Sequence, residues 1–222
     1  MRIVQEELTD EEVVRRIRSG ESFLFEIIMR RYNQRLFRVA KSILKNEGEA
    51  EDVIQDAYVR AYENLHQFAG EAKFSTWLTK IAIYESLRRM RRSKRFTSME
   101  DFTKGKEIMS ILKDENGNPE KDFFRRRVIE LLENAIGNLS TKYSLVIMLR
   151  DVEGLSTEET ARCLGISEEA VKTRLHRARS VLRKELSSGA GVTVKDLYPF
   201  AGERCDRIVA AVMDRIRLLP SF

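Results

Sequence analysis

The sequence predicts an all-α protein with two small helical domains, an irregular linker between them and a C-terminal helical extension. Its 222 residues include only three prolines and 11 glycines, so long stretches lack helix-breaking residues. In these stretches apolar residues recur every three or four positions, which is the spacing of a helix that buries one face. A chain of this length can form two domains that each bury their own core.

The first domain, residues 9–94, is predicted to be a helical bundle. Its leading helix begins with a capping box, in which Thr9 precedes Glu12 by three positions, and it ends at Gly20. Each of the three segments that follow places apolar residues on one helical face. These residues are Leu24, Ile28, Tyr32, Leu36, Val39 and Ile43, then Ala50, Val53, Ala57, Ala61 and Leu65, and finally Trp77, Ile81 and Tyr84.

Residues 95–121 are predicted to be an irregular linker, because they are charged, show no sustained apolar stripe and contain the turn-forming sequence ENGNP. The second domain follows at residues 122–187. The C-terminal extension, residues 188–222, opens with the flexible sequence SSGAG. We expect the amphipathic helix at about 200–217 to dock on the protein's own surface rather than on a dedicated partner. Its apolar face carries Ala201, Cys205, Ile208, Val212 and Ile216.

A helix-turn-helix is predicted in the second domain, within the sequence LSTEETARCLGISEEAVKTRLHRARSVLRKEL. Ser156 and Glu159 form a capping box, Ala161 is small where two helices must cross closely, and Gly165 lies in the turn. Ser167 is placed to cap the next helix. Glu168 and Glu169 follow it at the helix N-terminus, where the helix dipole favours carboxylates.

The second helix of this motif separates apolar from basic residues. Its predicted buried stripe consists of Val171, Leu175, Ala178 and Leu182. Six basic residues and no acidic one lie between positions 171 and 184: Lys172, Arg174, Arg177, Arg179, Arg183 and Lys184. A solvated helix face normally mixes both signs, so this pattern favours DNA over a solvated face. Residues near the helix start would reach base edges, and the later arginines would hold phosphates.

The first domain carries two segments of opposite charge. Residues 47–56, EGEAEDVIQD, contain five acidic side chains and no basic one, and such a patch would repel DNA. It must therefore face solvent or meet a basic protein partner. The segment at residues 73–95 reverses the sign, with eight basic residues against Glu85 alone.

Together these segments resemble the bacterial RNA polymerase sigma factors of the extracytoplasmic-function group, which keep only regions two and four of the sigma-70 family. AEDVIQDAYVRAYENL resembles their polymerase-clamp-binding helix, and FSTWLTKIA resembles the helix that melts and reads the minus-ten element. RDVEGLSTEETARCLGISEEAVKTRLHRARSVLRKEL resembles the region-four reader of the minus-thirty-five element. The resemblance covers residues 22–94 and about 124–187.

The resemblance implies three groups of binding residues. RNA polymerase would be bound by Glu51, Asp52, Gln55 and Asp56. The minus-ten region would be bound by Phe74, Ser75, Thr76, Trp77, Lys80, Tyr84, Arg88, Arg91 and Arg92, with the loop HQFAGEAK offering a pocket to a flipped base. The minus-thirty-five region would be bound by Ser167, Glu168, Glu169, Lys172, Thr173, Arg174, Arg177 and Arg179. Tyr84 and Arg88 stand where the family commonly has smaller polar residues, so an unusual base preference is expected there.

The implied partners are core RNA polymerase, promoter DNA as duplex and as non-template single strand, and an anti-sigma factor. The implied function is promoter recognition and DNA opening, for a stress or envelope-response regulon, without enzymatic chemistry. The alternative is a helix-turn-helix regulator that acts without joining the polymerase, but it leaves the acidic segment unexplained. A nucleic-acid enzyme has little support, because no phosphate-binding glycine loop or metal-ligand cluster is present in the sequence.

Charge and cysteine content bound the remaining possibilities. Charged residues make up 34% of the chain and hydrophobic residues 42%, which indicates a folded protein with a highly charged surface. No apolar run approaches the ~20 residues that span a bilayer, and no signal peptide is evident, so we expect a soluble, cytoplasmic protein without membrane insertion. Cys163 and Cys205 lie at zinc-ligand spacing with neither histidine. They are expected to be buried, reduced thiols, and no metal or cofactor is expected.

Overall fold

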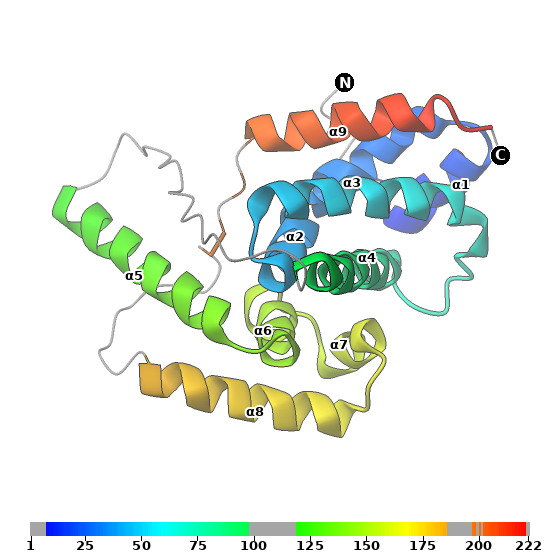
Figure 1. Ribbon diagram of the computed structural model, residues 1–222. Helices are drawn as coiled ribbons and strands as arrows, with labels where there is room; N and C mark the ends of the chain where they lie inside the picture. The colour runs from blue at the N-terminus through cyan, green and yellow to red at the C-terminus, as the bar shows by residue number, and fades with distance from the viewer. Residues whose placement is uncertain (1–7, 98–118, 186–196, 199, 201, 221–222) are drawn as a thin grey trace.

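The structure, a computed structural model, describes residues 8–97, 119–185, 197–198, 200 and 202–220 (Figure 1). Within these ranges every regular element is a helix, which confirms the predicted fold class. None of the helices in the described part of the chain combines the length and the apolarity needed to cross a membrane. Most of the predicted linker, and the start of the predicted extension, lie outside the described residues.

Four helices form the N-terminal bundle. They are α1 (Asp10–Arg18), α2 (Phe25–Leu44), α3 (Glu47–Glu63) and α4 (Phe74–Thr97), with 3-10 turns at Ser22–Leu24 and Leu65–Gln67. The predicted cap of α1 is present, since Thr9 Oγ1 accepts a hydrogen bond from the Glu12 amide at 3.2 Å. The predicted stripes of α2 and α3 are buried, Tyr32 only partly. Helices α2, α3 and α4 pack against one another around this core.

Two helix boundaries differ from those expected. Helix α4 continues through the basic run to Thr97 instead of ending at residue 94, because arginine, lysine and methionine are good helix formers. Helix α5 (Pro119–Asn138) begins at its proline rather than at residue 122. Proline is favoured in the first helical turn, where a backbone N–H has no intrahelical acceptor.

The C-terminal domain is built around the predicted helix-turn-helix. Helix α6 (Thr141–Ile147) continues into a π-helical turn at Met148–Val152, and α7 (Thr157–Leu164) and α8 (Glu168–Glu185) follow. Both halves of the capping box at Ser156 and Glu159 are present, and Gly165 ends α7 with a left-handed φ of 63° that favours glycine. Val146, Ala161 and Val171 join α6, α7 and α8 in a small separate core.

The two domains pack directly on each other. Helix α2 contacts α6, and α4 contacts α7. The Ser144 hydroxyl donates to the Ser42 carbonyl at 3.1 Å, and the largely buried Glu153 carboxylate accepts from Arg35 and Arg38, each at 3.3 Å. This arrangement brings together residues about a hundred positions apart, and local sequence patterns did not predict it.

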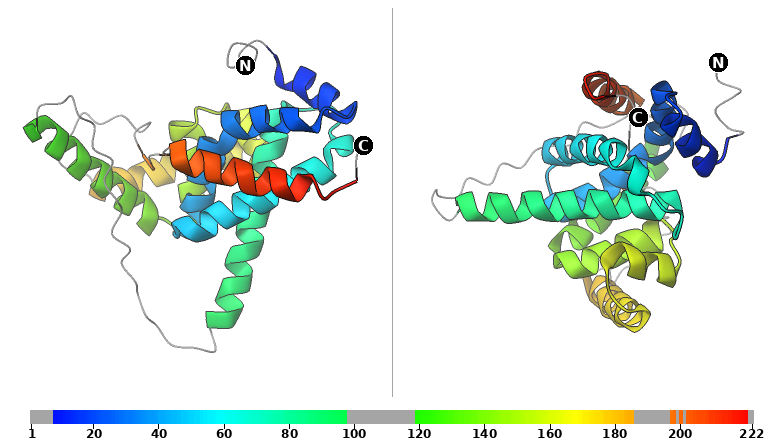
Figure 2. Two further views of the ribbon diagram at one scale, coloured as in Figure 1. Left: turned by 90° about the horizontal axis from the view of Figure 1, so that it is seen from above. Right: turned by 90° about the vertical axis from the view of Figure 1, so that its right-hand side faces the viewer.

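Helix α9 (Gly202–Ile216) lies across α2 and α3, on the opposite side of the molecule from α8 (Figures 1 and 2). This confirms the expected docking on the protein's own surface. Ile208, Val209, Val212 and Ile216 are buried. Burying such side chains stabilises docking by about 1.5–3 kcal/mol each, whereas an exposed ion pair contributes about 0–1 kcal/mol. The apolar stripe therefore holds α9, and charged pairs set its register.

Candidate functional surfaces

Most of the residues expected to contact DNA on the helix-turn-helix are exposed. Helix α8 buries Val171 and Ala178 and partly buries Leu175 and Leu182, as predicted. Arg174 is only partly exposed, whereas the rest of this set is open to solvent: Ser167, Glu168, Glu169, Lys172, Thr173, Arg177 and Arg179. The side chain of Lys184 lies outside the described residues. Helix α8 thus exposes basic side chains along its length, preceded by two carboxylates in its first turn.

Neighbouring carboxylates restrain two of the basic groups on α8. Arg179 forms two hydrogen bonds with Asp151, at 2.5 and 3.0 Å, and these bonds raise the pKa of the guanidinium. The Lys172 ammonium lies 3.6 Å from a carboxylate oxygen of Glu169, one turn earlier on the same helix. Arg177 extends into solvent. Arg179 therefore has a closer carboxylate partner than Lys172 on the same helix.

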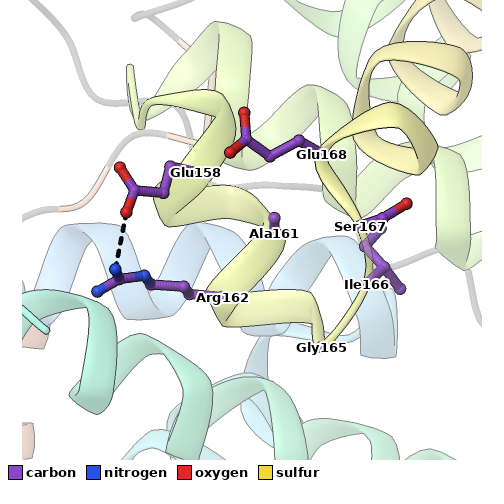
Figure 3. A pocket seen from close by; sticks show the side chains of 7 residues that line it. All are labelled: Glu158, Ala161, Arg162, Gly165, Ile166, Ser167 and Glu168. Atoms are coloured by element: carbon purple, nitrogen blue, oxygen red, sulfur yellow. Dashed lines mark hydrogen bonds and ion pairs between the residues drawn. The ribbon is translucent and has the colours of Figure 1, made fainter. Parts of the chain in front are cut away.

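The turn between α7 and α8 contains a shallow hollow (Figure 3). Ser167 begins α8 by accepting a hydrogen bond from the Ala170 amide at 3.2 Å. On the other side of the hollow, Arg162 pairs with Glu158 at 2.7 Å. Two carboxylates, those of Glu158 and Glu168, line the hollow, so it does not suit a phosphate group.

The residues expected to bind the minus-ten region divide into two groups along α4. Lys80, Tyr84, Arg88, Arg91 and Arg92 are exposed. At the start of the helix, Phe74 and Thr76 are buried, whereas Ser75 and Trp77 are half-buried. The Trp77 ring packs against Phe68 and Phe74, with ring centroids 5.6 and 5.5 Å apart. Trp77 thus supports the bundle with part of its surface.

Helix α7 covers the start of α4 and the loop before it. The Cys163 thiol donates to the Thr76 carbonyl at 3.7 Å, and Arg162 donates to the Glu71 carbonyl at 2.9 Å. The Lys73 ammonium pairs with Glu159 at 2.8 Å. Burial in this contact raises the pKa of the Cys163 thiol to about 12. Helix α7 therefore contacts the loop of residues 66–73 at Glu71 and Lys73, while most of the loop stays exposed.

Further along α4, arginines pair with acidic groups of the bundle. The Glu85 carboxylate is 2% exposed and binds both Arg60 and Arg88, the latter at 2.6 Å. Arg89 approaches Asp52 at 3.3 Å, which turns this carboxylate of α3 toward α4. Arg88 is consequently an exposed side chain with a fixed carboxylate partner rather than a free cation.

The acidic face of α3, which comprises Glu47, Glu49, Glu51, Asp52 and Asp56, is divided between two neighbours. Asp52 faces α4, whereas arginines of α9 hold Glu47, Glu51 and Asp56. The separations are 2.6 Å for Arg204 and Glu47, 2.8 Å for Arg204 and Glu51, 2.9 Å for Arg207 and Glu51, and 2.9 Å for Arg215 and Asp56. Gln55 is half-buried. Two of the four residues expected to bind polymerase, Glu51 and Asp56, are thus already paired within the chain.

The spacing of three arginines in the sequence of α9 indicates this pairing, although the apolar stripe of the helix alone does not. Arg204, Arg207 and Arg215 are spaced three and eight residues apart, which puts them on one face of a helix beside the apolar stripe. Asp206 lies on the other side of the stripe and pairs with Arg30 of α2 at 2.7 Å. The charges on both flanks of α9 therefore match the two helices between which it lies.

One polar contact beneath α9 is poorly matched. Asn33 of α2 is 1% exposed, and its amide nitrogen donates to the Cys205 sulfur at 3.1 Å. Among the described residues no hydrogen-bond partner is found for its amide oxygen. A buried polar group left unsatisfied costs about 1–3 kcal/mol, and that free energy would be regained when water reaches it.

Comparisons with known proteins match both domains. Residues 28–96 match the family described as Sigma-70 region 2, and residues 129–182 match Sigma-70, region 4. The chain is 31% identical over 176 residues to the ECF RNA polymerase sigma factor SigW of Bacillus subtilis (strain 168), covering 78% of this chain and 94% of SigW. It is 27% identical over 187 residues to the ECF RNA polymerase sigma-E factor of Escherichia coli (strain K12), covering 81% and 95% of the two chains.

Two solved structures have a similar fold. CnrH, solved in complex with the cytosolic domain of CnrY, is 28% identical with a TM-score of 0.56, over 82% of this chain and 99% of CnrH. The sigma factor RpoE, solved with the anti-sigma factor NepR from Bartonella quintana, has a TM-score of 0.56 over 73% of this chain and 98% of RpoE. At 22% identity the RpoE match supports the fold alone.

Proposed function

The chain belongs to the extracytoplasmic-function group of the sigma-70 family, and we propose that it binds core RNA polymerase through the acidic face of α3 and reads promoter DNA with α4 and α8. The observation that carries this assignment is the separation of charge by helix. One helix presents five carboxylates within residues 47–56, and two other helices present basic surfaces. The Asp52 side chain remains 60% exposed despite its contact with Arg89, and a factor that joins a basic protein partner as well as DNA uses both kinds of surface.

In this function, DNA opening draws on binding energy and needs no bond chemistry. Tyr84 is 59% exposed beside the basic residues of α4, and the half-buried Trp77 lies two turns earlier on the same face of the helix, so aromatic rings and phosphate-binding groups occur together. Stacking on an unpaired base contributes about 1–3 kcal/mol, and flipping a base out costs a few kcal/mol. Capture of the non-template strand on this surface therefore offsets the cost of melting a few base pairs.

The direct test is transcription with purified components. Adding the full-length protein to bacterial core RNA polymerase and genomic promoter fragments should give transcripts with defined start sites. Promoter-independent transcripts alone would contradict the proposal. Mapping transcript starts across a genome after overproduction would then supply both recognised promoter elements and the regulon.

A charge-reversal experiment separates this function from that of an ordinary helix-turn-helix regulator, which the open surface of α8 also suits. Asp52→Lys combined with Asp56→Lys should weaken core polymerase binding by about 100-fold, because like charges then oppose a basic partner. Binding to duplex DNA should stay within about twofold, since α8 lies on the far side of the molecule. Glu63→Lys, an exposed change on the same helix, is the matched control. Unchanged polymerase binding in the double variant would favour the regulator.

The setting of this function is part of the same proposal. We place the protein in the cytoplasm, where core polymerase and promoter DNA are found. We also propose that an anti-sigma factor binds it, as the resemblance to the family implies; the 28% identical CnrH was itself solved in complex with a second protein, the cytosolic domain of CnrY.

A further inference from the structure

We propose that α9 is an internal competitor of RNA polymerase, which occupies the acidic face of α3 and has to leave before polymerase binds there. The inference rests on the proposed function, which assigns Glu51 and Asp56 to the polymerase. It adds that α9 of the same chain already occupies this surface. The basic side chains of α9 are of the kind that a partner of these carboxylates must have.

Arginines of α9 already pair with two carboxylates of α3, those of Glu47 and Glu51. Arg204 reaches Glu47 and Glu51 at 2.6 and 2.8 Å, and its guanidinium also lies 4.4 Å from the ring centre of Phe37. Arg207 donates three further hydrogen bonds to Glu51, at 2.9, 3.0 and 3.1 Å. The Glu51 side chain is left only 14% exposed. A carboxylate with this many donors around it has little room for a second cation.

Asp56 extends the competition along α3. Arg215 lies 2.9 Å from it, at the far end of α9, so the helix spans the acidic face from Glu47 to Asp56. The backbone of α9 also lies over α3 along this length, as Figures 1 and 2 show. A partner that approached Glu47, Glu51 or Asp56 would meet arginines of α9, whereas Asp52 remains 60% exposed beside α4. The competition is therefore steric as well as electrostatic.

The docking is built in a way that allows release. Arg207 and Arg215 are 58% and 45% exposed, so water and salt compete for their ion pairs. Asn33 beneath α9 finds only the Cys205 sulfur for its amide and would be better solvated if the helix left. Apolar contacts also hold the docked form: Ile208 and Val212 of α9 are fully buried, and Phe200 just before the helix packs on Phe37 of α2 with ring centroids 5.4 Å apart. Release therefore needs a partner that replaces these contacts, and polymerase binding to the acidic face would shift the equilibrium toward the released form.

The test uses full-length variants in which α9 is weakened and the acidic face is untouched. Arg207→Gln combined with Arg215→Gln removes two exposed guanidinium groups. Val212→Asp places a charge at a fully buried position of α9. If α9 is docked about nine-tenths of the time in the native protein, each variant should bind core RNA polymerase up to about tenfold more tightly, because apparent affinity scales with the fraction of open protein.

Two control variants make the same kinds of substitution at positions that do not hold α9 on α3. Arg217→Gln removes an arginine that pairs only three residues away, with Asp214 at 2.9 Å. Ala210→Asp adds the same charge as Val212→Asp at an exposed position of the same helix. Both should bind polymerase with the native affinity. Equal affinity in all five proteins, or weaker binding in the two α9 variants, would overturn the inference and show that α9 is neutral or part of the binding surface.

Hydrogen exchange reports the same event without mutation. The backbone amides of residues 202–216 should exchange slowly in the native protein and faster when core polymerase is added, because an undocked helix of this length is marginal in water. Continued protection in the polymerase complex would overturn the inference.

The failure of the inference is distinguishable from failure of the proposed function. If native protein binds polymerase and Asp52→Lys with Asp56→Lys abolishes binding, while the α9 variants change nothing, only the competition is wrong. If none of the proteins binds polymerase, the proposed function and the inference fall together.

Discussion

Helix α8 and the first half of α4 are both assigned to promoter DNA, yet the protein presents them differently. Lys172, Thr173 and Arg177 on α8 are open to solvent, whereas Phe74 and Thr76 on α4 are buried and the Thr76 carbonyl lies against Cys163 of α7. If both helices bind promoter DNA as proposed, α8 needs no rearrangement, whereas the start of α4 is reached only when the two domains separate. Duplex recognition would then come before strand capture at the start of α4.

The contact that covers α4 has the properties of a reversible one. Its polar contacts are two hydrogen bonds and an ion pair. The Cys163 thiol donates to the Thr76 carbonyl, Arg162 donates to the Glu71 carbonyl, and the exposed Lys73 pairs with Glu159. Ion pairs of this kind contribute about 0–1 kcal/mol in water. Separation of the domains would also break the pairs of Glu153 with Arg35 and Arg38 and part of the apolar core that the two domains share, so it needs a partner that offsets this cost. Polymerase, by holding the domains apart, would expose the strand-binding surface.

The largest expected effect concerns the basic residues of α8. Lys172→Ala, Arg174→Ala and Arg177→Ala together should lower duplex DNA affinity of the protein without polymerase by about 100-fold, because each phosphate contact contributes to counterion release. A plot of log affinity against log salt should become less steep by about 3. Arg15→Ala, an exposed change on α1, should alter neither quantity. If the triple variant binds duplex DNA as the native protein does, α8 is not the ready surface that the comparison requires.

The faces of the helices were predictable from sequence, and their partners were not. The stripes of α2, α3 and α8, the cap at Ser156 and the glycine turn at Gly165 are properties of neighbouring residues, so a period or a short motif reveals them. The contact of Cys163 with Thr76 joins residues 87 positions apart, and Arg215 with Asp56 joins residues 159 apart. Only the arginine spacing of α9 hinted at such a pairing. Phe74 and Thr76 were assigned correctly to a helix start, but nothing local indicated that α7 would cover them.

A second prediction concerns a substitution that should separate α7 from the start of α4. Arg162→Glu replaces the donor to the Glu71 carbonyl with a carboxylate and sets it beside Glu158, so it should separate α7 from α4. We expect alkylation of Cys163 by iodoacetamide to speed up by about tenfold, because the thiol becomes accessible and forms its thiolate more readily. Affinity for a single-stranded oligonucleotide should rise in parallel.

The control for this opening is Arg127→Glu on α5, an exposed arginine that pairs with Glu130 at 3.2 Å. Thermal unfolding should show that both variants remain folded. Slow alkylation of Cys163 in the Arg162 variant, equal to that in the control, would mean that Arg162 does not hold the covered surface closed.

The smallest expected effect tests whether α7 stays packed on the start of α4 in solution. Burial raises the pKa of Cys163 from 9.0 to about 12, with Glu159 nearby also raising it and Arg35 lowering it. The unfolded chain therefore releases this proton first, so stability from the protonated thiol is present below pH 9.0 and declines as the pH rises toward 12. At about pH 9.5 the native protein should have lost about 1 kcal/mol of unfolding free energy from this group, and Cys163→Ala should lack that decline. Urea unfolding of both proteins at neutral and alkaline pH measures the difference. Parallel pH profiles would mean that Cys163 titrates normally, and hence that α7 does not rest on α4 for most of the time.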